Sequence, residues 1–171
     1  MNKFDSSGLA LRVAKTCAGD VKLAYSGRGL YALTLPGLQP AGSRVIGAED
    51  PPWLQKLALD LAAYFRGEAV QFSCPLDESG YPPFVLKVLR ETAKIPYGHR
   101  TSYGELAAQV GSPRAARAVG QAMARNRTPV IIPCHRVLCS DGSLGGFGSG
   151  LPWKERLLGL EGIQWEVKRC K

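Results

Sequence analysis

The chain has 171 residues, of which 45% are hydrophobic and 21% charged, and this composition excludes a disordered or fibrous protein. The length allows one domain or two small ones. Lys and Arg number 22 against 14 Asp and Glu, so the formal net charge is +8, which is compatible with an anionic polymer as partner. Apolar runs stop short of the ~18 to 20 residues of a membrane span, and no signal-like stretch opens the chain. We therefore expect a soluble, non-secreted protein without a membrane partner.

The first half predicts a small antiparallel sheet with one covering helix. Apolar stretches at 9–15, 21–26 and 30–35 are separated by turns that contain glycine, which is typical of a meander of three strands. Residues 53–66 repeat apolar side chains every three or four positions and stop at Gly67, so an amphipathic helix is expected there.

A stretch rich in proline and glycine, 73–83, separates this part from the rest. We place the boundary within it, between a supporting α/β domain at 1–76 and a second domain at 77–171. Residues from 76 onward carry 14 basic and 8 acidic side chains, and so most of the excess positive charge. Between Glu105 and Asp141 there is no acidic residue. This basic stretch is either an ordinary solvated face or the contact surface of an anionic partner.

The second half predicts short helices. Apolar positions between 84 and 93 form one helical stripe, and Ser102 with Glu105 matches a capping box at the start of a helix that runs to about Val110. Ser112 and Pro113 fit the N-cap and first position of a further helix to about Arg125. The whole is thus an α+β protein whose second domain is mainly helical, with a winged-helix-like helix-turn-helix. The alternative is a plain helical hairpin within a core.

The last of these helices has a basic face built otherwise of small side chains. Arg117 is the long side chain at the middle of this face, and Ala116 and Ala118 are its neighbours. The minor groove of B-DNA is only about 6 Å wide, so small residues would let a helix backbone approach it. The residues expected to bind DNA are Arg114, Ala116, Arg117, Gln121, Arg125 and Arg136.

The apolar segment 129–137 is expected to be a strand that runs into Cys134 and His135. A thiol needs a base or a positive environment to become a nucleophile near neutral pH. Neighbours on a strand point to opposite faces, so His135 reaches the thiol only through irregular backbone or a water molecule, and Pro133 favours irregularity. Glu161, after a helix at 151–160, is a candidate to orient the histidine. The alternative is that Cys134 is a small buried hydrophobe.

The sequence Ile132-Pro133-Cys134-His135-Arg136-Val137 resembles the active-site signature of the O6-alkylguanine-DNA alkyltransferases, which repair DNA by direct reversal. Further segments of the chain are similar to this family in order and spacing, and the likeness runs from 84 to 162. These segments are Ile95-Pro96-Tyr97-Gly98, Thr101 to Ala107, Arg114 to Gly120, and Leu157 to Gly162.

The resemblance implies a reaction that happens once per molecule. Cys134 would accept the alkyl group from guanine O6, His135 would act as its base through water, and Glu161 would orient His135. Tyr103 would donate to guanine N3 and help to rotate the nucleotide out of the duplex, while Arg117 would fill the gap. The other substrate-binding positions implied are Asn126, Val137, Phe147, Gly148 and Ser149.

The resemblance also implies a partner, double-stranded DNA that contains O6-alkylguanine, and leaves open whether O4-alkylthymine is a further substrate. We expect a monomer without a cofactor or metal, located in the cytoplasm, or in the nucleus if the source is eukaryotic. Phe147 stands where many relatives have Tyr, Gly148 where some relatives have Ser, and Leu89 where relatives commonly have Trp.

Three rival functions remain. The first is a non-enzymatic relative that only binds alkylated DNA, in which Trp replaces the cysteine. The second is a Cys-His hydrolase or transpeptidase. The third is a transcriptional regulator that reads the major groove. The five cysteines are odd in number and lack CxxC spacing, so neither a disulfide framework nor a zinc knuckle is expected.

Overall fold

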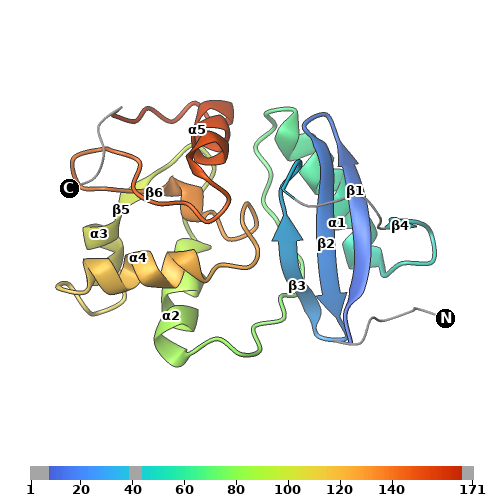
Figure 1. The fold of residues 1–171 in the computed structure, drawn as a ribbon, viewed down its shortest axis with the longest axis horizontal. Coiled ribbons are helices and arrows are strands. Elements are labelled where there is room, and N and C mark those ends of the chain that lie inside the picture. Colours follow the sequence, from blue (N-terminus) through green and yellow to red (C-terminus); the bar gives the residue numbers. More distant parts are fainter. Residues whose placement is uncertain (1–7, 39–43, 167–171) are drawn as a thin grey trace. The chain divides into compact units, whose positions relative to one another are not determined.

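The computed structural model describes residues 8–38 and 44–166, coloured along the chain in Figure 1. The chain divides into two compact units, Met1–Ser79 and Gly80–Lys171, which we call the sheet unit and the helical unit. Along the part that the structure describes, no helix is long and apolar enough to cross a membrane.

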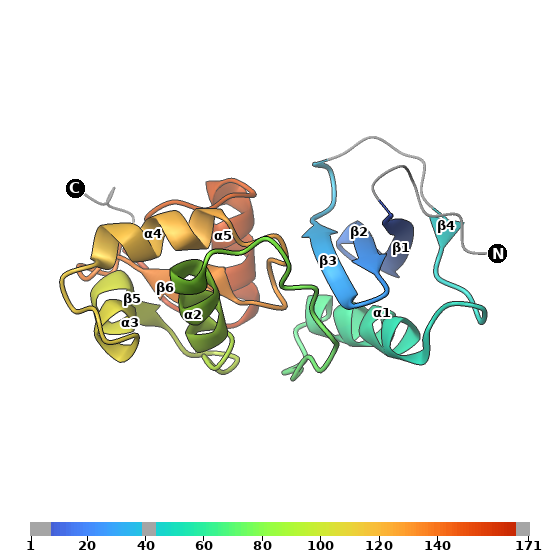
Figure 2. The same ribbon diagram turned by 90° about the horizontal axis from the view of Figure 1, so that it is seen from below.

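Among the residues that the structure describes, the sheet unit is a four-stranded sheet with one helix. Strands β1, β2 and β3 form the expected antiparallel meander, and the short β4, which the sequence did not predict, pairs parallel to β1. Helix α1 covers one face of the sheet (Figures 1 and 2). The order in the sheet is β3-β2-β1-β4, with bounds β1 Ala10–Thr16, β2 Gly19–Ser26, β3 Gly29–Thr34, β4 Arg44–Val45 and α1 Pro52–Phe65.

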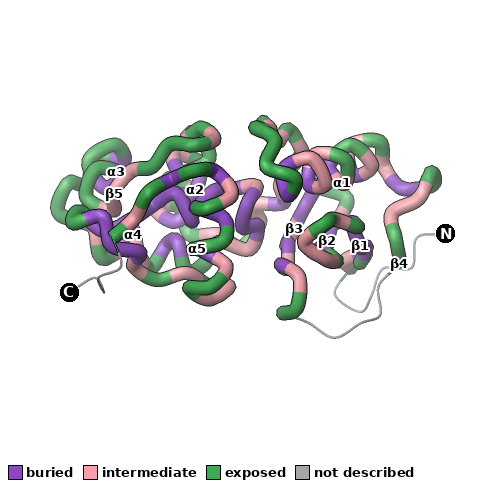
Figure 3. Tube along the Cα trace, turned by 90° about the horizontal axis from the view of Figure 1, so that it is seen from above, coloured by how far each residue is buried: buried purple, intermediate pink, exposed green. Residues whose placement is uncertain are grey.

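Side-chain periodicity explains this packing. Along β2, Val21, Leu23 and Tyr25 are buried and alternate with half-buried residues, so they share the face of the strand that lies on the core. Figure 3 colours the chain by burial. Helix α1 buries Leu54, Leu57, Leu61 and Tyr64 with helical spacing on one face. Two periodic apolar faces thus form the core of the sheet unit.

The described residues of the helical unit form four α-helices and a short parallel pair of strands, β5 and β6. Helices α2, α3 and α4 pack on one another, and α5 packs on the short 3₁₀ turn η1 that precedes β6. The bounds are α2 Pro83–Thr92, β5 Thr101–Ser102, α3 Tyr103–Gln109, α4 Ala116–Ala124, η1 Cys134–Arg136, β6 Val137–Leu138 and α5 Leu151–Leu160. The α+β class is therefore confirmed, while the winged-helix-like detail stays a prediction.

The start of α3 agrees with its predicted capping box. The Ser102 hydroxyl accepts a hydrogen bond from the Glu105 backbone N–H, and the Glu105 carboxylate accepts one from the Ser102 N–H. The start of α4 does not agree with the prediction. The Ser112 carbonyl accepts from the Ala115 N–H and closes a turn, so the helix begins only at Ala116.

The segment before Cys134 is not the expected strand. Val130 has a φ of 75°, in the left-handed region that β-branched residues avoid, and the Ile132 N–H donates to the Thr128 carbonyl. The chain then forms the turn η1 at Cys134–Arg136. Compact turns thus replace extended backbone, and this carries both Cys134 and His135 into the interior.

Candidate active site

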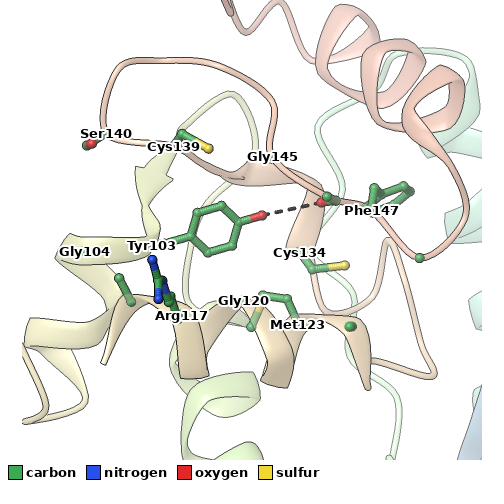
Figure 4. A pocket seen from close by; sticks show the side chains of 14 residues that line it. Tyr103, Gly104, Arg117, Gly120, Met123, Cys134, Cys139, Ser140, Gly145 and Phe147 are labelled. Atoms are coloured by element: carbon green, nitrogen blue, oxygen red, sulfur yellow. Dashed lines mark hydrogen bonds between the residues drawn. The ribbon is translucent and has the colours of Figure 1, made fainter. Parts of the chain in front are cut away.

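A pocket of about 670 Å³ lies in the helical unit, between α3, α4 and the glycine-rich segment 142–150. Figure 4 shows Cys134 at this pocket, with Tyr103 and Phe147 on its walls. Apart from Cys134, Tyr103 and Phe147, its lining includes Ala116, Arg117, Gly120, Met123, Cys139, Gly145 and Gly148. Much of this lining was predicted from separate motifs, which the fold brings together around one thiol.

Cys134 is a free thiol that is 6% exposed. Burial raises its pKa above the ordinary thiol value, and the two largest opposing contributions come from side chains, ahead of backbone hydrogen bonds at Cys134 and His135. The first is Asn126, whose amide donates to Cys134 Sγ over 3.1 Å and to the Ile132 carbonyl over 2.9 Å. The second is the positive charge of Lys154. The resting thiol therefore holds its proton at neutral pH and needs a base.

A base lies next to it in the chain. His135 is fully buried, and its Nε2 lies 2.7 Å from Glu161 Oε1. Burial lowers the pKa of His135, although the hydrogen bond and charge of Glu161 oppose the shift. The ring is therefore neutral near pH 7 and able to accept a proton.

Arg136 completes this buried cluster and does not reach the surface. Its guanidinium donates to Glu161 Oε2 over 2.8 Å and Oε1 over 3.0 Å, and also to the Ile95 carbonyl. The side chain is 6% exposed. The prediction that Arg136 contacts DNA is therefore wrong for this arrangement. The Glu161 carboxylate also accepts a hydrogen bond from the Gly98 N–H. This carboxylate can stay ionised in the interior because it is paired with the Arg136 guanidinium.

Tyr103 begins α3 and lies across the pocket from Cys134 (Figure 4). Its hydroxyl donates to the Gly146 carbonyl over a long 3.4 Å, and burial raises its pKa to about 12. The phenol is therefore a proton-bearing donor throughout the physiological range.

The surface of α4 carries the arginines that the sequence assigned to DNA. Arg114, just before the helix, and Arg117, Gln121 and Arg125 are all exposed, whereas Ala116 is half-buried. Figure 4 shows Arg117 on α4 at the rim of the pocket, near Tyr103. The neighbouring turns of this helix present Ala116, Gly120 and Ala124 to the pocket.

Of the remaining predicted positions, Phe147 and Gly148 line the pocket, and Ser149 is half-buried beside them. Val137 is buried in β6 and its carbonyl accepts a hydrogen bond from Lys154. Cys139 lines the pocket as well, but it is disulfide-bonded and so is not a second free thiol.

The sequence analysis missed Lys154, a lysine that is buried within α5. A signal was present, because Lys154, Leu157, Leu158 and Glu161 have helical spacing and share one face. A lysine on a face of leucines is a rare pattern in a soluble helix, and it indicates a cation that has a specific partner in the core.

Comparison with known proteins agrees with this site. Residues 83–163 match the family model for the DNA-binding domain of 6-O-methylguanine DNA methyltransferase. A methylated-DNA–protein-cysteine methyltransferase of Mycolicibacterium paratuberculosis is 44% identical over 119 residues, which cover 70% of this chain and 72% of that protein. The constitutive protein of the same name from Bacillus subtilis is 44% identical over 121 residues, 70% of this chain and 73% of its own length.

A solved structure extends the likeness to the fold. The crystal structure of Mycobacterium tuberculosis OGT in complex with DNA superposes with a TM-score of 0.74 at 38% identity, over 88% of this chain and 91% of that one. Together with these relatives, the fold and the buried cysteine at the pocket define a DNA-repair protein that transfers an alkyl group to a cysteine. The chain belongs to the methylated-DNA–protein-cysteine methyltransferase family.

Proposed function

We propose that this protein repairs DNA by moving the alkyl group of O6-alkylguanine onto Cys134, once per molecule. The observation that carries the proposal is the free Cys134 thiol at a pocket beside a buried His135–Glu161 pair. The pocket also opens beside a helix with exposed arginines, as a double-stranded DNA substrate would require.

The chemical step begins with proton transfer. His135, held by Glu161 at Nε2, takes the proton of the Cys134 thiol through a water molecule. The thiolate attacks the alkyl carbon, a carbon–sulfur bond forms, and the bond from that carbon to guanine O6 breaks. The bonding electrons stay on the guanine, which then takes one proton, and His135 returns its proton to solvent. No step cleaves the thioether, so the protein is consumed.

Tyr103 supports this step at the leaving base. Its pKa of about 12 keeps the hydroxyl protonated, so it donates a hydrogen bond to guanine N3 as negative charge develops. The hydroxyl makes only a long hydrogen bond to Gly146, and a bound base with a better-placed acceptor would replace that contact.

Access to the base requires that it leaves the duplex. Rotating a nucleotide out of the stack costs a few kcal/mol, and a side chain that fills the gap offsets part of this cost. Arg117 is exposed on α4 at the rim of the pocket, where it would replace the base and hydrogen-bond to its orphaned partner. The small residues on either side, Ala116 and Gly120, let α4 approach the minor groove.

The guanine would be held by main-chain groups. The carbonyls of Cys134 and Val137 accept the guanine amino group, and the Val137 carbonyl, which already binds Lys154, has a second lone pair for this purpose. Asn126 joins α4 to the segment of the nucleophile through its hydrogen bonds to the Ile132 carbonyl and to Cys134 Sγ.

Phe147, Gly148 and Ser149 form the wall near the alkyl group. The pocket volume of about 670 Å³ is larger than a methyl group needs. We extend the proposal to O4-alkylthymine because thymine is the smaller base.

The decisive experiment is intact and peptide mass spectrometry after incubation with duplex DNA that contains O6-methylguanine. We expect one methyl mass per protein, on Cys134. Cys17 and Cys74, which are also free thiols, serve as internal controls and stay unmodified. A Cys134→Ala variant should bind the DNA and transfer nothing. Repeated turnover would indicate a hydrolase-like reaction, and binding without transfer would indicate the non-enzymatic alternative; either result would overturn the proposal.

A further inference from the structure

Arg127 is the arginine of the acid-free stretch between Glu105 and Asp141 to which the proposed function gives no role. It lies just beyond the end of α4 and contacts Tyr81 at two points. Its guanidinium carbon is 4.0 Å from the centroid of the tyrosine ring, and its backbone N–H donates to the tyrosine hydroxyl over 3.0 Å. A guanidinium at this distance from an aromatic face makes a favourable cation–π contact.

The contact joins two distant parts of the helical unit. Tyr81 comes just before α2, and 46 positions separate it from Arg127. Both residues are half-buried. A backbone N–H in an irregular, partly buried segment needs an acceptor from elsewhere in the chain. The Tyr81 hydroxyl supplies this acceptor, and so fixes the path of the chain where it leaves α4.

The residue that precedes Arg127 contacts the nucleophile. Asn126 donates from its side-chain amide to Cys134 Sγ over 3.1 Å, and its side-chain oxygen accepts from the Thr128 N–H over 3.0 Å. The Asn126 carbonyl and the Arg127 N–H belong to one planar peptide group. The Tyr81 hydroxyl therefore holds the peptide plane that directly follows Asn126.

We propose that Tyr81 and Arg127 are positioning residues for the alkyl transfer, which hold the peptide after Asn126 so that the Asn126 amide stays directed at Cys134 Sγ. This role rests on the proposed function and adds two residues to it. Neither residue gives up a proton or forms a covalent bond in the step, so the balance of the reaction is unchanged.

The thiol reports the position of the Asn126 amide. Burial raises the pKa of Cys134, and the hydrogen bond from Asn126 is the largest contribution that lowers it. A change at Tyr81 or Arg127 leaves in place the titratable groups that face or adjoin the thiol. These groups are Tyr103 from α3, His135 in η1 and Lys154 from α5. A rise in the pKa of the thiol in such a variant would therefore indicate a displaced Asn126 amide.

The readout is the rate at which iodoacetamide alkylates Cys134 as a function of pH. It is measured on the Cys134 peptide, because Cys17 and Cys74 are also free thiols. Iodoacetamide needs no DNA, so a lost contact between Arg127 and DNA could not produce an effect in this assay.

Three variants remove different parts of the contact. Tyr81→Ala removes the ring and the hydroxyl, Tyr81→Phe removes only the hydroxyl, and Arg127→Gln removes only the guanidinium. Arg156→Gln is the matched control, because it removes an exposed arginine that lies over another aromatic ring, 4.8 Å from the centroid of Trp153 in α5.

We expect Tyr81→Ala to raise the midpoint of the pH profile by about 0.5 pH units or more, which is about a threefold loss of thiolate below the midpoint. Tyr81→Phe and Arg127→Gln should each cause part of this rise, and Arg156→Gln should keep the wild-type midpoint. In an Asn126→Ala background, Tyr81→Ala should cause no further rise, because the amide that it positions is gone. A folded Tyr81→Ala protein with the wild-type midpoint, or an equal rise in both backgrounds, would overturn the proposal.

A second measurement observes the Asn126 amide itself and applies even if Tyr81→Ala does not fold. Hydrogen exchange of this side-chain amide, followed by NMR, should be severalfold faster in Tyr81→Phe and Arg127→Gln than in the wild type and Arg156→Gln, because the amide leaves its acceptors more often. Equal exchange rates would overturn the proposal. If the wild-type protein fails to transfer methyl groups from DNA, the proposed function fails, while these two measurements still decide whether Tyr81 and Arg127 position the amide.

Discussion

Gly145 lies so close to Tyr103 that a Cβ at this glycine would be 2.9 Å from both Cε2 and the hydroxyl of the tyrosine ring. Its φ of 66° is also in the left-handed region. Both the backbone and the contact therefore favour glycine at position 145, which lies directly against the ring that faces Cys134.

We accordingly expect Gly145→Ala to slow methyl transfer by about tenfold or more, because strain of about 1–3 kcal/mol must be relieved by moving either the wall or Tyr103. Gly146→Ala is the matched control, since a Cβ there meets nothing within 4 Å. Single-turnover rates of the two variants, with circular dichroism to verify folding, check the prediction. Equal rates would show that Tyr103 does not depend on this contact.

Arg136 provides a test of the corrected DNA interface. In a Cys134→Ala background, Arg136→Met should leave the affinity for duplex DNA within about twofold, whereas Arg114→Ala should weaken it and reduce the salt dependence by about one counterion. Removing the buried partner of Glu161 should nevertheless cost about 3–5 kcal/mol of stability. Binding isotherms at several salt concentrations and thermal unfolding measure both effects. A large loss of affinity in a folded Arg136→Met protein would restore the arginine to the DNA surface.

His135 makes stability and transfer depend on pH in a defined direction. Its pKa is lowered in the folded state because the ring is buried, so below about pH 6.5 the unfolded chain binds more protons than the folded one. The free energy of unfolding therefore falls as the pH drops below that value, down to the folded-state pKa. The transfer rate should show no inflection at pH 6.5 itself, because the folded ring is still neutral there.

Unfolding and single-turnover rates from pH 5 to 8 test this behaviour of the histidine. His99→Gln, which removes the other histidine of the chain at an exposed position, should leave both profiles unchanged. A fall in the transfer rate that is centred near pH 6.5 in the wild type would contradict a buried, neutral base.

The sheet unit has an ionic cluster of its own. Arg12 Nε lies 2.7 Å from Asp50 Oδ1, and this carboxylate also accepts from the Tyr25 hydroxyl at 3.1 Å and the Gly47 N–H at 3.0 Å. Burial by itself would raise the pKa of Asp50, but these hydrogen bonds outweigh it and the pKa is lowered. The cluster therefore stabilises the folded unit above the unfolded-state pKa of about 3.9 and loses this effect as the pH falls through the lower folded-state value.

We expect Arg12→Met to destabilise the sheet unit by about 3–5 kcal/mol at pH 7, because an unpaired carboxylate stays buried. The deficit should shrink near pH 3, where Asp50 takes up a proton. Lys15→Met, which breaks an exposed ion pair with Asp20 on the same sheet, should have little effect. Thermal unfolding at both pH values measures the difference, and a deficit that does not depend on pH would contradict the electrostatic origin.

Local interactions made much of this protein predictable from its sequence. The meander, the capping box of Ser102 and Glu105, and α5 depend on contacts between residues a few positions apart, so periodicity and turn residues were sufficient to predict them. The motif Cys134-His135 indicated the chemistry, and the arginines of α4 indicated the partner. Both could be predicted because the types of reactive and charged residues are known from the sequence alone.

Tertiary structure decided what depends on distant residues. The left-handed Val130 and the turn at Cys134 replaced an expected strand, and burial against Glu161 removed Arg136 from the surface. Lys154 became part of the site only because carbonyls 8 to 17 positions away converge on its ammonium. The sequence by itself therefore determined which groups can react. The fold determined which cation lies near the thiol, because the energy of a buried charge depends on its spatial neighbours, and the order of residues does not reveal these.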